Sequence, residues 1–186
     1  MLLLVGLGNP GSTYTNTRHN IGFKIIDAIN SHFKLSKQKP KFKGLLTTGN
    51  IEEKKIYAIK PLTFMNNSGT AIKELIDYFK IDAKDVFVFH DDMDIDFGKI
   101  KAKFGGSSAG HNGIESIDKF IGKDYSRVRI GIGKPNEKIS AADYVLNDFS
   151  EEEKENLEKI TNNIIESLAI LIDKKLDLFS STVNNN

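Results

Sequence analysis

The chain has 186 residues, of which 39% are hydrophobic and 27% are charged, and its formal net charge is +1. This composition is typical of a soluble globular domain that is long enough to bury a core. Because the chain has no cysteine, disulfide bonds, thiolate nucleophiles and zinc–thiolate sites are excluded. The early apolar run Leu2–Val5 lacks a basic leader and is too short for a signal peptide or a membrane span, so we expect a cytoplasmic protein that does not enter a membrane.

Predicted strands and helices alternate along the first half of the chain. A nearly continuous apolar run over 2–7 predicts a buried strand, which the turn residues Gly8-Asn9-Pro10-Gly11 end. Apolar residues at helical spacing predict a helix over 20–33. The runs KKIYAIKP (54–61) and DVFVFHDD (85–92) predict two further strands, and the helix between them begins at Asn67 or Ser68.

The second half adds two alternating segments and two helices. KIKAKF (99–104) and SRVRIGIG (126–133) predict strands that each place basic residues on one face and apolar residues, Phe104 included, on the other. A helix that starts near 111 is stopped by Gly122. The last long helix begins at Ser150, which forms a capping box with Glu153. We expect this helix to bury Leu157, Ile160, Ile164, Leu168 and Leu171.

Neither a repeat nor a low-complexity linker divides the chain. Residues 177–186 are polar, which predicts a frayed tail. We therefore predict one α/β domain over 1–186.

Charge is distributed unevenly despite the small net charge. Lysines gather in 34–43 and again in 98–106, whereas acidic residues gather in 150–158. A segregated charge distribution allows a basic surface that faces phosphates, although lysine runs are equally expected on solvated faces.

The N-terminal turn contains G-x-G-x-x-G at Gly6, Gly8 and Gly11, the fingerprint of a dinucleotide-binding loop. In such a loop a helix opens at the third glycine, but no helical periodicity follows Gly11 until residue 20, and Pro10 removes one N–H donor. We infer that the glycines instead make a sharp turn after a strand. That turn delivers Asn9, Tyr14 and His19 to the carboxyl edge of the sheet, where open α/β sheets bind ligands.

Three other predicted loops carry polar side chains to the same kind of position. FVFHDDMD ends in His90 and Asp91, PLTFMNNSG carries Asn66, and GGSSAGHNG carries His111 and Asn112 at a helix start. A lone histidine or asparagine in a loop is usually structural, but four converging loops favour a functional site.

These segments resemble the signature segments of the bacterial peptidyl-tRNA hydrolase family. The match comprises VGLGNPG…TRHNIGF, KPLTFMNNSG, FHDDMDIDFGKIKAKFGGSSAGHNGIESI and RVRIGIGKP, in the order and spacing of the family, over about 3–148. The resemblance implies a monomeric α/β domain with a mixed, mostly parallel twisted sheet surrounded by helices. It also implies cleavage of the ester between a peptide and the terminal ribose of tRNA, without a metal or a cofactor.

The resemblance also assigns roles to individual residues. The catalytic histidine of the family matches His19, and the acid that orients it matches Asp91. The lysine and the arginine that bind a tRNA phosphate match Lys103 and Arg129. The peptide-binding asparagines match Asn9, Asn66 and Asn112, and we add Tyr14 as a substrate-binding residue.

This set of residues suits hydrolysis of an activated ester. A neutral imidazole titrates close to the working pH, so His19 is a suitable general base for water, and Asp91 would hold its tautomer. Uncharged asparagine amides can bind peptide groups and a developing oxyanion. Lys103 and Arg129 would neutralise one or two phosphates, with the lysines of 34–43 as auxiliaries, so the enzyme would read little base sequence.

Two other functions remain open at this point. The histidines and acids could hold ions in a metal-dependent phosphoesterase, although no fixed ligand spacing is present; the residues concerned are His19, His90, His111, Asp91, Asp92 and Asp94. Alternatively, the domain could bind RNA without catalysis, as chloroplast relatives of the fold do in RNA splicing. Incubation with N-acetyl-aminoacyl-tRNA, with and without EDTA, separates all three functions.

Overall fold

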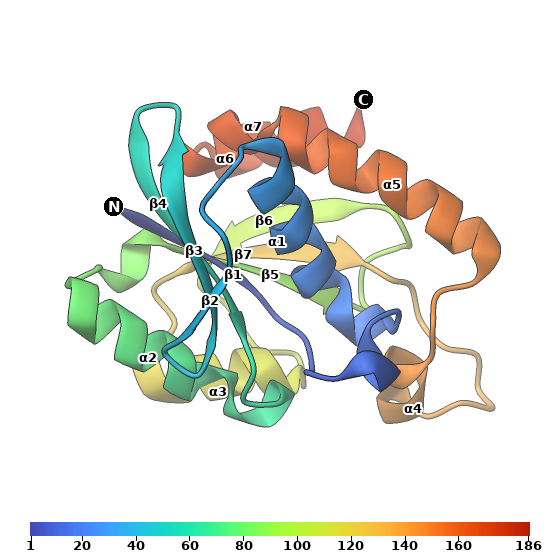
Figure 1. Ribbon diagram of the computed structural model, residues 1–186. Coiled ribbons are helices and arrows are strands. Elements are labelled where there is room, and N and C mark those ends of the chain that lie inside the picture. Colours follow the sequence, from blue (N-terminus) through green and yellow to red (C-terminus); the bar gives the residue numbers. More distant parts are fainter.

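A seven-stranded mixed sheet runs through the molecule in the order β2-β3-β4-β1-β5-β7-β6 (Figure 1). The computed structural model describes residues 1–186. The four central strands are parallel: β4 (Lys54–Pro61), β1 (Leu2–Gly6), β5 (Val86–Asp92) and β7 (Ser126–Gly131). The outer strands pair antiparallel: β2 (Lys39–Lys41), β3 (Gly44–Ile51) and β6 (Ile100–Phe104). The predicted α/β fold with a mixed, mostly parallel sheet is confirmed.

Helices cover both faces of this sheet (Figure 1). One face packs against α1 (Ile21–His32), α5 (Glu151–Glu166), α6 (Leu168–Ile172) and α7 (Leu176–Asn184). The other face packs against α2 (Ser68–Phe79) and α3 (Asn112–Ile121). The short helix α4 (Ala141–Leu146) has no buried residue. No helix combines the length and the hydrophobicity that a transmembrane helix requires.

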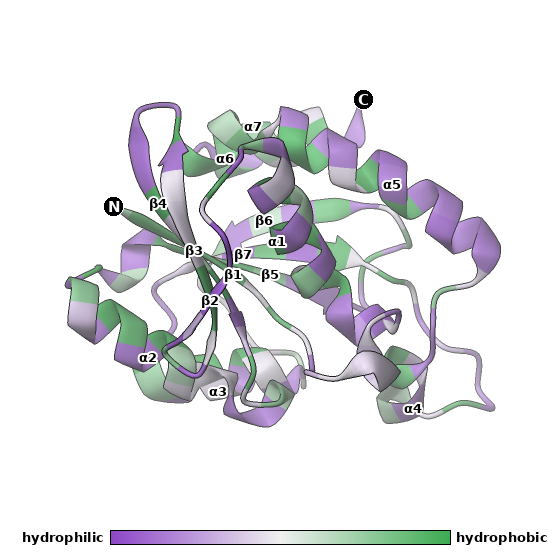
Figure 2. Ribbon diagram, in the orientation of Figure 1, coloured by the Kyte–Doolittle hydropathy of each residue, from purple (hydrophilic) through white to green (hydrophobic).

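The core lies in two layers because the central strands are buried on both faces. All five residues of β1 are buried, and they alternate between the two apolar clusters: Leu2 and Leu4 enter one, Leu3 and Val5 the other. In Figure 2 the central strands are hydrophobic, whereas the solvent side of α5 is hydrophilic. The continuous apolar runs of β1 and β5 therefore reflect burial on two sides.

The predicted helix boundaries agree with the structure at most ends. Helix α2 begins at Ser68, Gly122 ends α3 with a φ of 79°, and Ser150 and Glu153 form the expected capping box. The single C-terminal helix that we predicted is instead divided at Ser167 into α5 and α6. The division lets the chain bend around the sheet while Ile164 and Leu168 both stay buried.

The prediction of a frayed tail over 177–186 is wrong, because α7 packs on the edge strand β6. Phe179 and Val183, four residues apart, are buried in the core. The Asn184 side chain accepts a hydrogen bond from the Ile100 N–H and donates one to the Ile100 carbonyl, and Ser180 accepts one from the Ala102 N–H. Polar side chains of α7 thus satisfy backbone groups that an edge strand would otherwise expose.

The N-terminal glycines have packing and turn roles. A Cβ on Gly6 would lie 2.2 Å from the Gly22 carbonyl oxygen of α1, so only glycine lets strand and helix approach this closely. Gly11 has a φ of 105°, which favours glycine in the turn. Because α1 begins only at Ile21, the helix does not open at the third glycine, Gly11, as we inferred from the sequence.

Candidate active site

The four polar loops converge at the carboxyl ends of β1, β4 and β5, as the sequence predicted. A cavity of about 270 Å³ opens there, between the end of β5, the start of α3 and α4. Its polar lining includes His19, His90, Asp91, His111 and Asn112, and its apolar wall comes from Ala141, Ala142 and Val145 of α4.

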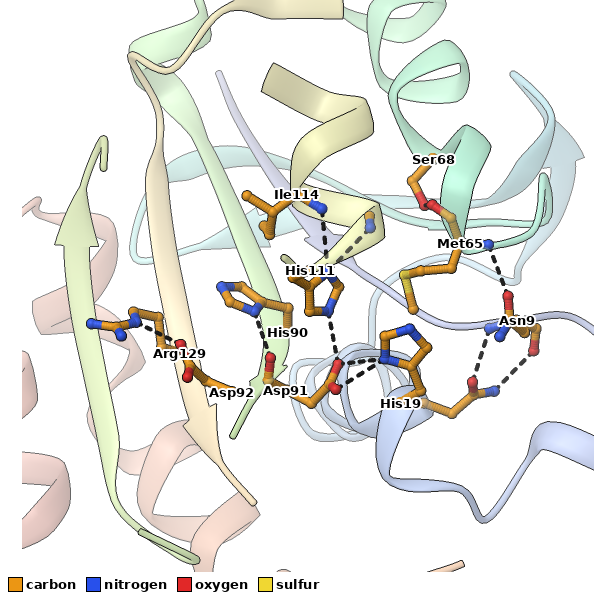
Figure 3. A network of polar contacts seen from close by, with 12 residues as sticks. Asn9, His19, Met65, Ser68, His90, Asp91, Asp92, His111, Ile114 and Arg129 are labelled. Carbon is orange, nitrogen blue, oxygen red and sulfur yellow. Dashed lines mark hydrogen bonds and ion pairs between the residues drawn. The ribbon is translucent and has the colours of Figure 1, made fainter. Parts of the chain in front are cut away.

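His19 and Asp91 are in direct contact in this cavity (Figure 3). His19 lies in the short 3-10 helix Arg18–Asn20, and its Nδ1 is 2.9 Å from Asp91 Oδ2 and 3.0 Å from Asp91 Oδ1. Both residues are buried. A carboxylate can only accept here, so His19 Nδ1 carries a proton, and in the neutral imidazole Nε2 keeps its lone pair. Nε2 makes no hydrogen bond within the protein.

His111 is a second imidazole partner of the same carboxylate. Its Nδ1 accepts hydrogen bonds from the N–H groups of Gly113 and Ile114 at the start of α3, at 3.1 and 3.3 Å. Nε2 therefore carries the proton, and it donates to Asp91 Oδ1 at 2.9 Å. The sequence singled out His111 only as a loop residue and as one donor of a metal site. Its position at the N-cap of α3 was the available signal for this role.

The two imidazoles keep the Asp91 carboxylate ionised although it is buried. Burial by itself would raise the pKa of Asp91, but the N–H groups that His111 and His19 direct at the carboxylate hold that pKa below its usual range. His90 differs: burial, and then the nearby His111, lower the pKa of His90 to about 3. His90 is thus neutral, and its Nδ1–H donates to the Asp91 carbonyl oxygen at 2.8 Å.

A reciprocal amide pair holds Asn9 beside this cluster. The Asn9 N–H donates to Asn20 Oδ1, and Asn20 Nδ2 donates to the Asn9 carbonyl oxygen, both at 2.9 Å. The Met65 N–H donates to Asn9 Oδ1 at 2.8 Å, which leaves Asn9 Nδ2 as a free donor. We did not single out Asn20 from the sequence. Its role depends on a partner eleven residues away, and no local pattern reports such a contact.

The other predicted substrate-binding residues lie around the cluster without contacting it. Asn112, the first residue of α3, is exposed and lines the cavity. Asn66 is exposed on the 3-10 helix Met65–Asn67, next to the Asn9 contact. The half-buried Tyr14 ring meets Phe64 edge to face at 6.5 Å. Asn9 itself lines a neighbouring groove between the glycine turn and β4.

The two arginines of β7 have different environments, although the alternation placed them on one basic face. Arg127 is buried, donates to Asp118 at 2.9 Å and to the Ser107 carbonyl oxygen at 2.7 Å, and fastens the loop before α3. Arg129 is partly exposed and donates from Nε to Asp92 at 2.8 Å. Its cross-strand neighbour is Lys101, whereas Lys103 faces Arg127.

The edge strand β6 follows the predicted alternation except at its last residue. Lys101 and Lys103 are exposed, and Ile100 and Ala102 are buried. Phe104 was expected on the apolar face but is 49% exposed, because β6 ends there beyond the residues that α7 covers.

Comparison with known proteins identifies the relatives of this chain. The family model described as peptidyl-tRNA hydrolase matches residues 3–186. The chain belongs to the peptidyl-tRNA hydrolase family. A peptidyl-tRNA hydrolase of Pelagibacter ubique is 77% identical over 185 residues, with all of both chains covered. One of Ehrlichia canis is 46% identical, over 98% of this chain and 94% of the relative.

Solved structures agree with this membership. The crystal structure of peptidyl-tRNA hydrolase from Acinetobacter baumannii matches with a TM-score of 0.92 and 32% identity, over 99% of this chain and 94% of that chain. The resemblance to this family that the sequence motifs indicated is confirmed.

The chemistry of the possible metal ligands in this site argues against the alternative of a metal-dependent phosphoesterase. His19, Asp91 and His111 do place donor atoms within 4.8 Å of one another. However, both imidazoles direct N–H groups at the carboxylate, and His111 Nδ1 is already occupied by two backbone donors. These three side chains are hydrogen-bonded to one another, and of their four ring nitrogens only His19 Nε2 keeps a free lone pair.

Proposed function

We propose that this protein hydrolyses the ester between peptide and tRNA, and that His19 removes a proton from the attacking water. The contact of His19 with Asp91 carries the proposal, because it leaves the basic Nε2 available in a cavity that His19 lines. As Nε2 takes the proton, the Asp91 carboxylate stabilises the imidazolium, as in a catalytic triad in which water replaces serine. Asp91 accepts from His111 throughout, which holds the carboxylate in place.

Asn9, in the groove next to the cavity of His19, would be a donor for the developing oxyanion. Its Oδ1 is held by the Met65 N–H, so its Nδ2 stays unpaired and fixed in direction. Its backbone is tied to Asn20, the chain neighbour of the base, so the donor and the base move as one unit. A preorganised donor of this kind is worth about 3 kcal/mol in the transition state. Asn66, Asn112 and Tyr14 would hold the peptide in this proposal.

Lys103 and Arg129 would bind a phosphate of the tRNA. Arg129 extends from β7 beside His90 at the end of β5, and Lys103 extends from β6, where its cross-strand neighbour is Arg127, two residues before Arg129. The terminal nitrogens of Arg129 make no contact within the chain. One or two phosphate contacts predict a shallow salt dependence and acceptance of many tRNAs. Because a single chain supplies every residue of the site, we propose that the protein acts as a monomer. We also propose that it acts without a cofactor, as the resemblance to the family implies, and in the cytoplasm.

His19→Ala tests the proposal with N-acetyl-aminoacyl-tRNA as substrate. We expect kcat to fall by about 10² to 10⁴, the usual contribution of a general base. His32→Ala is the matched control, because His32 is exposed at the far end of α1. Activity of the His19 variant within a few-fold of the wild type would remove His19 from this role. A wild type that binds tRNA without turnover would favour the RNA-binding alternative, and loss of activity in EDTA would favour a metal enzyme.

The free amino group of aminoacyl-tRNA gives a second test. A site that receives the neutral amide of a peptide would solvate an ammonium poorly, so we expect slower hydrolysis of aminoacyl-tRNA than of its N-acetylated form. Equal rates on the two esters would contradict this specificity.

A further inference from the structure

Two consecutive carboxylates at the end of β5 have separate partners. Asp91 accepts from His19 and His111, whereas Asp92 accepts from Arg129 Nε at 2.8 Å (Figure 3). The second oxygen of Asp92 accepts from the Asp94 N–H at 2.8 Å, which fixes the carboxylate at the start of the following loop. Asp91, which orients His19, is therefore the immediate chain neighbour of Asp92, which holds Arg129.

This ion pair determines which edge of the Arg129 guanidinium is free. Asp92 occupies Nε, so Nη1 and Nη2 remain without a partner in the chain. The Arg129 side chain is 26% exposed, and that of Asp92 is 9% exposed. In Arg127 both terminal nitrogens are used within the protein, and only 3% of the side chain is exposed. A planar pair of N–H donors that faces solvent suits bidentate binding of a phosphate.

We propose that Asp92 is a positioning residue that aims the terminal nitrogens of Arg129 at a tRNA phosphate. This inference rests on the proposed function of the site and on phosphate binding by Arg129. Asp92 acts through Arg129: without it, the guanidinium would rotate about its flexible stem, and part of the binding free energy would be spent on ordering it. Because Asp91 and Asp92 are adjacent on a buried strand, the bound phosphate is held at a fixed separation from His19.

A double-mutant cycle on tRNA binding tests whether Asp92 acts through Arg129. We measure the Kd for deacylated tRNA with the wild type, Asp92→Ala, Arg129→Gln and the double variant. Asp92→Ala should weaken binding about 3-fold to 10-fold, the cost of an unpositioned phosphate contact. In the Arg129→Gln background the same substitution should have no further effect. Additive losses would overturn the proposal, because they would mean that Asp92 acts independently of Arg129.

The conservative variant separates orientation from charge. Asp92→Asn keeps an oxygen that can accept from Nε, so it should restore a Kd at or below that of the wild type. If Asp92→Asn bound tRNA as weakly as Asp92→Ala does, the result would contradict a positioning role.

Hydrolysis gives a further readout that a damaged fold would not imitate. N-acetyl-aminoacyl-adenosine carries the same ester but no phosphate, so we compare kcat/KM on this compound and on N-acetyl-aminoacyl-tRNA. Asp92→Ala should lower the ratio of tRNA substrate to nucleoside substrate about 3-fold to 10-fold, through KM. An unchanged ratio would overturn the inference. Failure of the proposed function would look different, since the wild type would then hydrolyse neither ester while the binding cycle still reported on Asp92.

Discussion

Arg127 and Asp118 form an ion pair of 2.9 Å in which only 3% of the Arg127 side chain is exposed. Two residues along β7, Arg129 pairs with Asp92, and 26% of the Arg129 side chain is exposed. The Tyr125 hydroxyl donates to the same Asp118 oxygen at 2.7 Å, and burial, followed by its hydrogen bond to Asp118, raises the pKa of Tyr125 above its usual range. Strand β7 thus carries one arginine, Arg127, that stabilises the fold, and another, Arg129, whose terminal nitrogens can bind a ligand.

Removal of Arg127 should therefore destabilise the fold. Arg127→Leu leaves the Asp118 charge buried without its partner and frees the Ser107 carbonyl oxygen, so we expect a loss of about 3–5 kcal/mol in the free energy of unfolding. Urea denaturation measures it. Arg129→Gln is the matched control, and its partly exposed ion pair should contribute less, about 1 kcal/mol. Equal losses in the two variants would contradict the difference in environment.

The hydrogen bond between His111 and Asp91 should matter for the rate. His111→Ala removes a charge-assisted donor, and we expect kcat to fall about 10-fold to 100-fold on N-acetyl-aminoacyl-tRNA. His111→Gln can still present an N–H near the position of Nε2, so it should retain more activity than the alanine variant. Thermal unfolding of both variants controls for the loss of the α3 cap. An alanine variant within twofold of the wild type would show that His19 alone suffices to hold Asp91.

The neutral, buried His90 should make the protein less stable in mild acid. The pKa of His90 is lowered to about 3 in the folded state by burial and by His111, whereas an unfolded histidine titrates near 6.5. Between these values the unfolded chain binds the proton, so stability is full above pH 6.5 and is lost progressively as the pH falls toward 3. This one group contributes a loss of about 2 kcal/mol between pH 7 and pH 5.

His90→Asn isolates this contribution, because an asparagine amide can donate to the Asp91 carbonyl oxygen but does not titrate. The variant should show a smaller decrease in unfolding free energy from pH 7 to pH 5 than the wild type, even if its stability at pH 7 is lower. Parallel stability curves would assign the acid sensitivity to other groups, such as Asp91, whose ionised form is also the stabilising one.

The lysines of 34–43 should not act with Lys103 and Arg129. Strand β2, with Lys39 and Lys41, forms one edge of the sheet and β6 forms the other. Six inter-strand steps separate them, about 29 Å at the usual spacing. Lysine and proline on an exposed edge are a common protection against strand pairing. We expect Lys39→Ser with Lys41→Ser to change the Kd for tRNA less than twofold, and Lys103→Ser to weaken it about 3-fold to 10-fold, measured by filter binding. If the Lys39 and Lys41 substitutions weakened tRNA binding as much as Lys103→Ser does, the lysines of 34–43 would be auxiliary tRNA-binding residues.

Local sequence patterns predicted most of the architecture and the location of the site. Buried strands produce continuous apolar runs and amphipathic helices produce a 3.6-residue period, so β1 and β5 could be predicted from the sequence. Ligands bind at the carboxyl ends of parallel strands, so the convergence of Asn9, His19 and Asp91 could be predicted as well. The match to family motifs added the expected functions of these residues.

Contacts between distant segments could not be predicted from local sequence patterns. Asn20 and His111 gain their roles from Asn9 and Asp91, and nothing local distinguishes them from other loop residues. The sequence predicted a frayed tail because Ser180 and Asn184 are polar. These side chains order the tail through hydrogen bonds to β6, about eighty residues earlier in the chain.

The sequence by itself determined the four central strands, the helices α1, α2 and α3, the glycine turn and the set of polar groups at the sheet edge, because each depends on neighbours along the chain. Only the tertiary structure decided which groups touch: one carboxylate is shared by two imidazoles, and one arginine is buried while the other is partly exposed. The physical reason is that burial and ion pairing depend on what packs across the sheet, and identical side chains two residues apart can meet different partners there.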